Sequence, residues 1–355
     1  MKKVLIVNPF GIGDVLFSTP LVAAIKAQDP SISISYIGNA RTAAFLLHDP
    51  RLHKVFSYER DEFVAVYKTS PWQFLIKWKK FVETLRTESF DTAYDLSNGS
   101  PLGLALFLTG IPQRIGFDYK GRGRWLTQKI PLKGYEGRHV AEYILDLMDG
   151  PGRPVGSSGH MNLYVSEKDH TWALDWMQAH GFSAKGFMVF FPGGGASWGK
   201  GAGLKQWPVE GYVKLSEKII ERSKCPIILM GDKNEGSLCR SIASRYPARI
   251  FSLAGQLNLT QSVALMRQAR CVVANDGGPL HMAVASGVAT VSIFGPVDPL
   301  VYGPYPAGLS HRVVVKGLPC QPCYRNFRMS GCGHQRCLKD LTVDEVFEAL
   351  KEFVV

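Results

Sequence analysis

The sequence lacks the long apolar run that a membrane-spanning helix needs, which is about 20 residues. Its nearest candidate, residues 101–112, is short and interrupted by Gly and Pro. We expect no signal peptide either, because only four apolar residues follow the two N-terminal lysines before a glycine turn begins. These absences favour a cytoplasmic protein, and any contact with the cytoplasmic membrane would be peripheral, at its inner face.

Acidic residues are outnumbered in the chain. The 355 residues include 30 Asp and Glu against 41 Lys and Arg, which gives a formal net charge of +11. Such a surplus favours an anionic partner, such as nucleic acid, acidic lipid headgroups or a phosphorylated substrate. No zinc-finger spacing, basic-region helix or aromatic RNA-binding signature is present, so we expect no nucleic-acid partner.

Short apolar runs alternate with helical patterns along both halves of the chain, which is typical of parallel α/β sheets. The length also favours two domains. The expected strands are 3–8, 33–38, 54–58 and 92–97 in the first half and 187–192, 226–231, 249–254, 271–276 and 289–294 in the second.

The predicted domain organisation follows from a Gly, Pro and Ser-rich stretch at 149–160, whose composition is typical of a linker. We predict two doubly wound, Rossmann-like domains over 1–155 and 156–340 that face a central cleft. Ligands in such sheets bind at the carboxyl ends of the strands. Residues 341–355 are predicted to form a helix with a capping box, able to pack back on the first domain.

A glycine turn with an aspartate follows the first predicted strand. Gly11 and Gly13 would let the backbone approach a ligand, and Asp14 lies near a helix start. Asp14 is either a helix cap or a carboxylate that accepts a proton from a substrate hydroxyl. The third glycine and downstream acid of a dinucleotide fingerprint are missing.

A second glycine-rich loop, at 191–208, contains three consecutive glycines, 193–195, with Lys200 and Lys205 after them. Backbone amides of such a loop can bind an anion, and a lysine can neutralise phosphate. The alternative is a plain flexible loop. Lys205 is the stronger candidate because Trp207 anchors the chain just after it. The Gly-Lys-Ser/Thr ending of a Walker loop is missing.

A third turn carries an aspartate, two glycines and a histidine. Asp276 ends a strand, and Gly277 and Gly278 follow it with free amides. Pro279 suits the first turn of a helix, and a helix N-terminus at this place would bind a diphosphate. His281 either donates to a phosphate or leaving oxygen, or is satisfied within the helix packing.

These segments together resemble glycosyltransferase family 9, which includes the ADP-heptose:lipopolysaccharide heptosyltransferases. The resemblance rests on "GIGDVLFSTPLVAAI", "PGGGASWGKGAGLKQWP" and "NDGGPLHMAVASGVATVSIFGPVDP", and also on "RIGFD" (114–118) and "RHVAEYILDLM" (138–148). Their order and spacing match over most of the chain. The resemblance implies a GT-B fold, with an N-terminal acceptor domain and a C-terminal nucleotide-sugar domain.

The resemblance also implies roles for individual residues. Asp14 would be the catalytic base of an inverting transfer of heptose from ADP-heptose to an anionic lipopolysaccharide-core-type acceptor. Leu257 would lie near the adenine, and Glu235 would hold the ribose, with Asp232 as its rival. The implied donor-binding residues are Gly194, Gly195, Lys205, Glu235, Leu257, Asp276, Gly277, Gly278 and His281.

The sequence departs from the family pattern where hydroxyl residues of well-known heptosyltransferases are replaced by Gly194, Gly195 and Gly277. The sugar specificity can therefore differ. No Asp-x-Asp motif appears where a divalent metal would bind the diphosphate, so we expect metal-independent catalysis without a cofactor. Two alternatives stay open: a transferase of the same fold that uses another donor such as a UDP-sugar, and a non-catalytic nucleotide-sugar-binding protein.

Two basic segments are candidates for contact with the acceptor. Residues 118–139 interleave basic and aromatic side chains, which fits either a solvated face or a clamp for an anionic glycolipid. The acceptor-binding candidates are Gly13, Arg114, Lys120, Arg122 and Arg124.

The other basic segment, 71–87, has an aromatic and aliphatic stripe from Phe74 to Leu85 that we expect to pack in the core. Its Lys77, Lys79 and Lys80 would also suit transient contact with an anionic inner-membrane surface.

Four of the seven cysteines gather near the end of the chain, with the spacing C-x2-C-x8-C-x4-C: Cys320, Cys323, Cys332 and Cys337. In a cytosolic chain such a cluster indicates metal or redox chemistry before disulfides. The spacing is compatible with a tetrahedral structural zinc site. Plain reduced thiols are the alternative.

Overall fold

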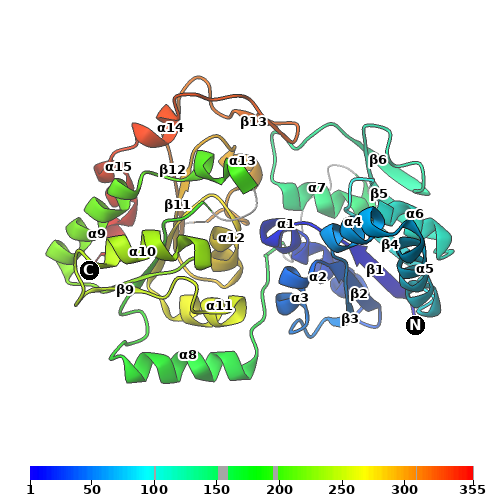
Figure 1. Cartoon of the computed structure of the whole chain (residues 1–355), viewed down its shortest axis with the longest axis horizontal. Coiled ribbons are helices and arrows are strands. Elements are labelled where there is room, and N and C mark those ends of the chain that lie inside the picture. The colour runs from blue at the N-terminus through cyan, green and yellow to red at the C-terminus, as the bar shows by residue number, and fades with distance from the viewer. Residues whose placement is uncertain (100, 151–158, 195–198, 309, 355) are drawn as a thin grey trace. The chain divides into compact units, whose positions relative to one another are not determined.

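The computed structural model describes residues 1–99, 101–150, 159–194, 199–308 and 310–354. The chain divides into two compact units, Met1–Met161 and Asn162–Val355, each with its own sheet (Figure 1). The domain boundary predicted at 155/156 lies outside the described residues.

The first unit is built on a six-stranded parallel sheet in the order β3-β2-β1-β4-β5-β6. The order reverses between β1 and β4, which is the point where doubly wound sheets bind ligands. The strands are β1 (Lys3–Val7), β2 (Ser33–Gly38), β3 (Leu52–Ser57), β4 (Thr92–Asp95), β5 (Gln113–Tyr119) and β6 (Gln128–Leu132). The helices are α1 (Ile12–Phe17), α2 (Thr19–Gln28), α3 (Ala40–Leu46), α4 (Arg60–Thr69), α5 (Pro71–Thr87), α6 (Pro101–Leu108) and α7 (Val140–Asp149).

The second unit repeats this design, with the strand order β12-β11-β10-β7-β8-β9 and a reversal between β10 and β7. The strands are β7 (Met188–Phe191), β8 (Ile227–Leu229), β9 (Ile250–Ser252), β10 (Cys271–Asn275), β11 (Thr290–Phe294) and β12 (His311–Val315), with a small hairpin of β13 (Tyr324–Arg325) and β14 (Arg328–Met329). The helices are α8 (Glu167–Ala179), η1 (Gly199–Lys205), α9 (Val209–Ser223), η2 (Lys233–Glu235), α10 (Gly236–Ala243), α11 (Leu259–Gln268), α12 (Gly278–Ala285), α13 (Pro299–Tyr302), α14 (Arg336–Lys339), α15 (Val343–Leu350) and η3 (Lys351–Phe353).

Each predicted strand is present. The structure adds five that the sequence analysis did not predict: β5, β6 and β12 in the two main sheets, and the short strands β13 and β14 of the hairpin. The central strands β1, β2, β7, β10 and β11 are almost wholly buried, so they read as continuous apolar runs. The edge strands β6 and β12 are half exposed and carry polar residues, as does the start of β5, so no apolar run marks them.

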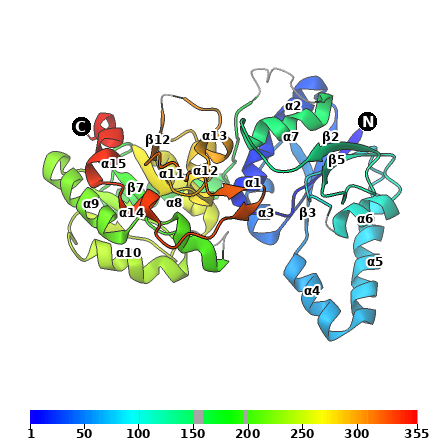
Figure 2. The same ribbon diagram turned by 90° about the horizontal axis from the view of Figure 1, so that it is seen from above.

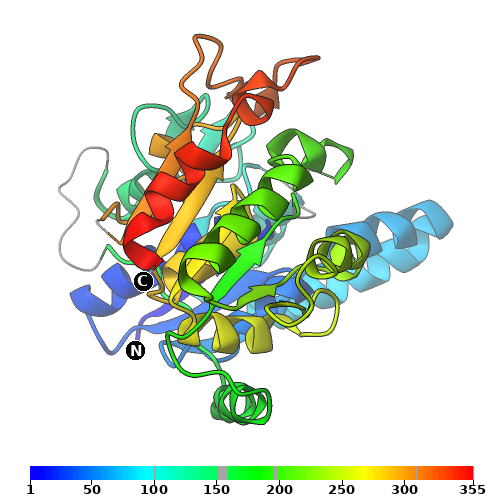
Figure 3. The same ribbon diagram turned by 90° about the vertical axis from the view of Figure 1, so that its left-hand side faces the viewer.

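The C-terminal helix packs within the second unit, which corrects the expectation that it could return to the first. Val346, Phe347 and Leu350 are buried in the core of the second sheet. Figure 3 shows α15 (red) beside α9 (green) over one face of that sheet. The predicted capping box is present, because Thr342 Oγ1 accepts from the Glu345 backbone and the Glu345 carboxylate accepts from the Thr342 backbone.

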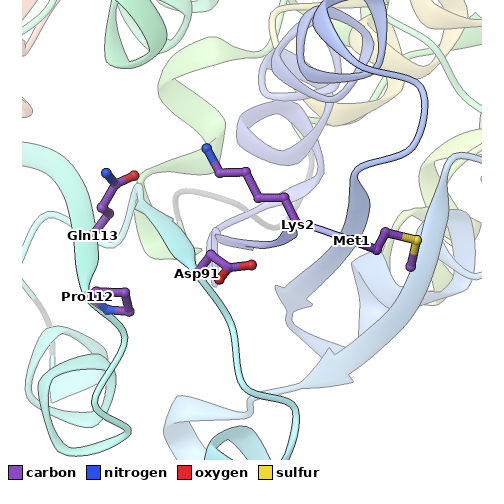
Figure 4. Close-up of a pocket in the computed structure, with 5 residues that line it drawn as sticks. All are labelled: Met1, Lys2, Asp91, Pro112 and Gln113. Atoms are coloured by element: carbon purple, nitrogen blue, oxygen red, sulfur yellow. The ribbon is translucent and has the colours of Figure 1, made fainter.

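One pocket lies at the amino ends of the first sheet (Figure 4), lined by Met1, Lys2, Asp91, Pro112 and Gln113. These residues precede or begin β1, β4 and β5. The pocket is therefore at the edge opposite to the carboxyl ends where such sheets bind ligands. The Asp91 carboxylate already accepts a hydrogen bond from the Lys3 backbone at 2.7 Å.

Across the described ranges, no helix is both long and apolar enough to cross a membrane.

Candidate functional site

At the switch point of the second sheet, one buried side chain joins three segments. Asn275, the last residue of β10, donates through Nδ2 to the carbonyl oxygens of Pro192 (3.2 Å) and Gly193 (2.9 Å) in the loop after β7. Its Oδ1 accepts from the Trp207 backbone at 3.0 Å, just beyond η1. The glycine loop and the segment that carries Lys205 are thereby held at the end of β10.

A buried ion pair lies next to this amide. Lys205 Nζ is 2.7 Å from Asp276 Oδ2, and the two side chains are 8% and 4% exposed. Desolvation of two charges consumes most of the attraction between them, so such a pair is a poor source of stability. Charges kept in a buried position at the ligand-binding edge of a sheet are typical of functional sites.

His281 lies one turn into α12 and is buried close to the same pair. Burial lowers its pKa to about 3, and the positive charge of Lys205 acts in the same direction. The imidazole is therefore neutral at neutral pH, so it can donate one hydrogen bond but brings no positive charge to the site.

The structure brings Glu235 to the glycine loop. A Cβ added at Gly193 would lie 1.6 Å from Glu235 Oε1, so the carboxylate occupies the space that a side chain at 193 would need. Glu235 Oε2 accepts from the Asp232 backbone at 3.0 Å. Asp232, the rival candidate, caps η2 by accepting from the Asn234 and Glu235 backbones.

The remaining donor-binding candidates surround these residues. Gly194 is buried, and a Cβ there would lie 2.4 Å from the Ala202 carbonyl oxygen. Gly277 and Gly278 start α12. Leu257 is half buried in the loop after β9, a loop that bonds to Gly231 through the Gly255 amide at 3.0 Å. Gly195 lies outside the described residues.

In the first unit, Asp14 follows β1 and is exposed in the first turn of α1, directly after Gly13. Its Oδ2 accepts from the Gly11 backbone at 3.2 Å, and its carbonyl oxygen accepts from Asn8 Nδ2 at 2.9 Å. The carboxylate thus stabilises the helix start, as the capping interpretation predicted, and still faces solvent.

The sequence analysis missed three polar residues at the end of β4, the neighbour of β1. Asp95 is buried and its pKa is raised by that burial, although the Ser97 backbone donates to its Oδ1 at 2.9 Å. Within the described chain, Ser97 Oγ and Asn98 Oδ1 are buried without a hydrogen-bond partner. The sequence indicates these residues only by their position, directly after a strand that is next to the switch point of the sheet.

The acceptor candidates of the basic segment separate into two groups. Lys120 and Arg122 lie at the carboxyl end of β5 against the Tyr119 ring, and Arg124 lies against Trp125. Gly99, with a φ of +76°, packs on Arg122, because a Cβ there would lie 2.8 Å from the Arg122 carbonyl oxygen. The turn that carries Lys120 and Arg122 therefore adjoins the loop after β4.

Arg114 does not join them, which corrects its place among the candidates. It lies at the amino end of β5, opposite to the ligand-binding edge. Its guanidinium donates to the carbonyl oxygens of Trp125 and Ile111, and burial lowers its pKa. These bonds give it a structural role.

The four clustered cysteines lie between β12 and the end of α14. Burial, followed by the charges of the other three, raises the pKa of Cys337 to about 11, so the thiols are close enough to interact. Cys332 Sγ accepts from the Gln335 backbone at 3.4 Å. In the part of the chain that the structure describes, no three metal-binding side chains are already grouped to hold an ion.

The lowered pKa of His281 predicts a pH-dependent stability. Below pH 6.5 the unfolded chain takes up a proton that the folded protein refuses, so stability is lost as the pH falls from about 6.5 toward 3. We expect the unfolding free energy of the second unit to fall by up to about 1.4 kcal/mol per pH unit, and this slope to flatten in His281→Gln. Urea unfolding at several pH values measures it. His180→Gln, at an exposed position, is the control, and equal slopes in the wild type and His281→Gln would contradict the prediction.

Comparisons with known proteins agree with this architecture. The family model described as "Glycosyltransferase family 9 (heptosyltransferase)" matches residues 78–332. Lipopolysaccharide heptosyltransferase 2 of Escherichia coli K12 is 24% identical over 367 residues, covering 99% of both chains. Lipopolysaccharide heptosyltransferase 1 of Pseudomonas aeruginosa is 24% identical and covers 91% of this chain and 86% of its own.

Solved structures share the fold over the whole chain. The structure of E. coli ADP-heptose lps heptosyltransferase II superimposes with a TM-score of 0.77 at 23% identity, covering 100% of this chain and 98% of that one. E. coli heptosyltransferase WaaC with ADP gives 0.72 at 18% identity, covering 99% of each. The predicted GT-B fold is confirmed, and the chain belongs to glycosyltransferase family 9, the heptosyltransferase family.

Proposed function

We propose that this protein is an inverting glycosyltransferase that moves heptose from ADP-heptose to an anionic acceptor of the lipopolysaccharide-core type. The observation that carries the donor part is the buried pair of Lys205 and Asp276 beside the N-terminus of α12. Among the relatives, the E. coli enzyme WaaC has been solved with ADP and with ADP-2-deoxy-2-fluoro heptose, which supports the same donor here.

The donor side supplies stabilisation for a departing diphosphate. The amides at the start of α12 point along the positive end of the helix dipole, and Lys205 adds a full positive charge. Asp276 keeps that charge neutralised while no anion is bound, and the amides and Lys205 then receive the negative charge that develops as the sugar–phosphate bond breaks. In this proposal Glu235, whose carboxylate lies against Gly193, accepts hydrogen bonds from the ribose hydroxyls.

The acceptor side supplies a base and a recognition surface. In this proposal, Asp14 removes the proton from the acceptor hydroxyl as its oxygen forms a bond to the anomeric carbon, on the face opposite to the departing ADP. Ser97 and Asn98, whose side-chain oxygen atoms have no partner in the described chain, bind sugar hydroxyls once the loop after β4 opens to expose them. Lys120 and Arg122 bind the acceptor's anionic groups. Lysine and backbone amides take the part that a divalent metal plays elsewhere, so the reaction needs none.

The donor assignment predicts that ADP raises the melting temperature of the protein more than UDP, GDP or CDP, with or without Mg²⁺. At 100 times its dissociation constant a ligand stabilises by about 2.7 kcal/mol, which a thermal shift detects. Lys205→Gln should weaken ADP binding about 10- to 100-fold, because a charged hydrogen bond is lost. Lys214→Gln, at an exposed position of α9, is the matched control.

Three outcomes would count against this donor site. A larger shift with UDP would favour the alternative donor class, and a shift that requires Mg²⁺ would contradict metal independence. Equal ADP affinities of folded Lys205→Gln and Lys214→Gln would place the donor elsewhere.

The base assignment predicts that Asp14→Asn lowers kcat about 10²- to 10⁴-fold while the affinity for ADP is unchanged. Asp175→Asn, on the exposed face of α8, should keep full activity. The assay is release of ADP from ADP-heptose in the presence of a lipopolysaccharide-core acceptor. Binding of ADP-heptose without turnover by the wild-type protein would instead favour a non-catalytic binding protein.

We also propose that Cys320, Cys323, Cys332 and Cys337 bind a structural zinc ion. Four thiols are a donor set that structural zinc uses, and Cys323 already contacts Cys320, because its Sγ donates to the Cys320 carbonyl oxygen at 3.1 Å. Their present positions do not yet form a coordination sphere, so no step of the reaction is assigned to the metal.

The zinc assignment predicts one zinc per chain in protein purified without chelators, measured by elemental analysis. Cys320→Ser/Cys332→Ser should remove the zinc, because two thiolate ligands are lost. Cys225→Ala, at a buried thiol outside the cluster, should keep it. Wild-type protein without zinc would favour plain reduced thiols.

A further inference from the structure

The α4–α5 hairpin of the first unit carries large apolar side chains on its outer side. On α5, Trp72, Leu75 and Ile76 are 72%, 53% and 57% exposed, and on α4 Val64 and Tyr67 are also exposed. These five residues are the hairpin patch. Figure 2 shows the hairpin extending away from the sheet of its own unit, with the turn between the two helices at its far end. The hairpin patch lies near this end.

The hairpin patch is separate from the face that packs in the core. Phe63 is buried and stacks on Tyr58 with ring centroids 4.9 Å apart. Phe74, Trp78 and Phe81 surround it at 6.3, 5.9 and 6.0 Å. The predicted core stripe is therefore confirmed and already satisfied, so exposure of the patch is not the result of incomplete packing.

The positions 72, 75 and 76 follow the i, i+3, i+4 spacing that puts side chains on one face of a helix. The apolar face of α5 that was predicted from the sequence uses other positions. The helix thus has two apolar faces, one facing Phe63 and one facing solvent.

Basic residues predominate next to the hairpin patch, and the acidic ones lie farther from the turn between the helices, at Asp61, Glu62 and Glu83. From Val64 to Lys80 the sequence contains four lysines and no acidic residue. Lys77 is used inside the hairpin, where it pairs with Glu62 and lies 4.9 Å from the centre of the Phe63 ring. Lys68, Lys79 and Lys80 are exposed. Lys79 lies 3.7 Å from Glu83 in an exposed pair, which contributes little and leaves the ammonium group open to solvent.

The lysines are placed next to the patch and not within it. Lys79 and Lys80 follow Leu75 and Ile76 by four residues each, so they lie one helical turn farther from the hairpin turn. The hairpin patch therefore forms an apolar end with lysines about one helical turn behind it. This arrangement fits a surface whose interior is apolar and whose outer layer is anionic.

We propose that the hairpin patch docks on the surface of an anionic phospholipid bilayer. Trp72, Leu75 and Ile76 then lie at the boundary between the headgroups and the acyl chains, and the lysines lie at the phosphates. Amphipathic segments with this arrangement lie in the membrane interface, and long lysine side chains extend toward the headgroups. Neither helix is both long and apolar enough to cross a bilayer. This docking does not depend on the identity of the donor or on the assignment of Asp14.

The experiment is co-sedimentation of the full chain with vesicles of phosphatidylglycerol and phosphatidylcholine, compared with phosphatidylcholine alone. Lys68→Gln/Lys79→Gln/Lys80→Gln should weaken binding to the anionic vesicles roughly 100-fold, since each lysine near such a surface contributes about a factor of five. Trp72→Gln/Leu75→Gln/Ile76→Gln should abolish binding while leaving the fold intact, because all three side chains are exposed.

The control is Lys168→Gln/Lys214→Gln/Lys339→Gln, which removes the same charge from exposed positions of the second unit. It should bind anionic vesicles within a few-fold of the wild type. Brominated lipid should quench tryptophan fluorescence in the wild type and quench it less in Trp72→Phe, which reports insertion of this ring.

Equal loss of binding in the two lysine triples would overturn the proposal, because the net charge of +11 would then explain the attraction. Unchanged binding of the apolar triple, or equal binding of the wild type to phosphatidylcholine alone, would overturn it as well. If the wild type self-associates, the apolar triple is monomeric and vesicle binding is the same in both, a second copy of the chain covers the patch.

Discussion

The carboxyl edge of the second sheet depends on one buried amide. The loop after β7 and the end of η1 are irregular, so neither has a regular hydrogen-bond ladder to fix it. Asn275 provides three hydrogen bonds that hold both. A buried polar group that loses its partner costs about 1–3 kcal/mol, so the arrangement closed on Asn275 is favoured over one in which these bonds are broken. Because Asp276 is the next residue, the closure also sets where Lys205 meets its carboxylate.

The two units carry chemically different groups at equivalent places in similar sheets. In the second, Lys205, Asp276 and His281 are buried, and the charge there is balanced before any ligand arrives. In the first, Asp14 and Arg122 are exposed, and the buried groups after β4 are uncharged hydroxyl and amide oxygens. Buried, balanced charges like those of the second unit suit a phosphate group held in a fixed position. Exposed charges beside neutral polar groups, as in the first unit, suit a large saccharide of variable charge.

The central strands and the three glycine turns could be predicted because each leaves a local mark. A strand buried on both faces is a run of apolar residues, and a turn that approaches a ligand needs glycine. Edge strands such as β6 leave no such mark, because half of their residues face water. The pairing of Lys205 with Asp276 joins residues 71 positions apart, so spacing alone indicated two lone candidates for phosphate and not an ion pair.

The sequence was least informative where a residue's type fits several roles. In the sequence, Arg114 cannot be distinguished from the neighbouring basic residues that were predicted to bind the acceptor. The structure places it at the amino end of β5, where it donates to carbonyl oxygens. Ser97 and Asn98 are ordinary turn residues, and their importance lies in burial without a partner. Asn275 looks like a strand end. The apolar stripe from Phe74 to Leu85 explains how α5 packs in the core. The sequence analysis therefore did not single out the second apolar face of this helix, at Trp72, Leu75 and Ile76.

The position of α15 has a consequence for the synthesis of the chain. Phe347 and Leu350 complete the core around β11 and β12, and the Trp207 ring donates to the Leu341 carbonyl oxygen at 3.1 Å. The first unit has its whole core by residue 161 and can fold while the ribosome is still translating. The second unit cannot close until residue 350 has left the exit tunnel. Nearly 200 residues of the chain therefore remain with an incomplete apolar core until translation ends, which is the period when a chaperone would be most useful.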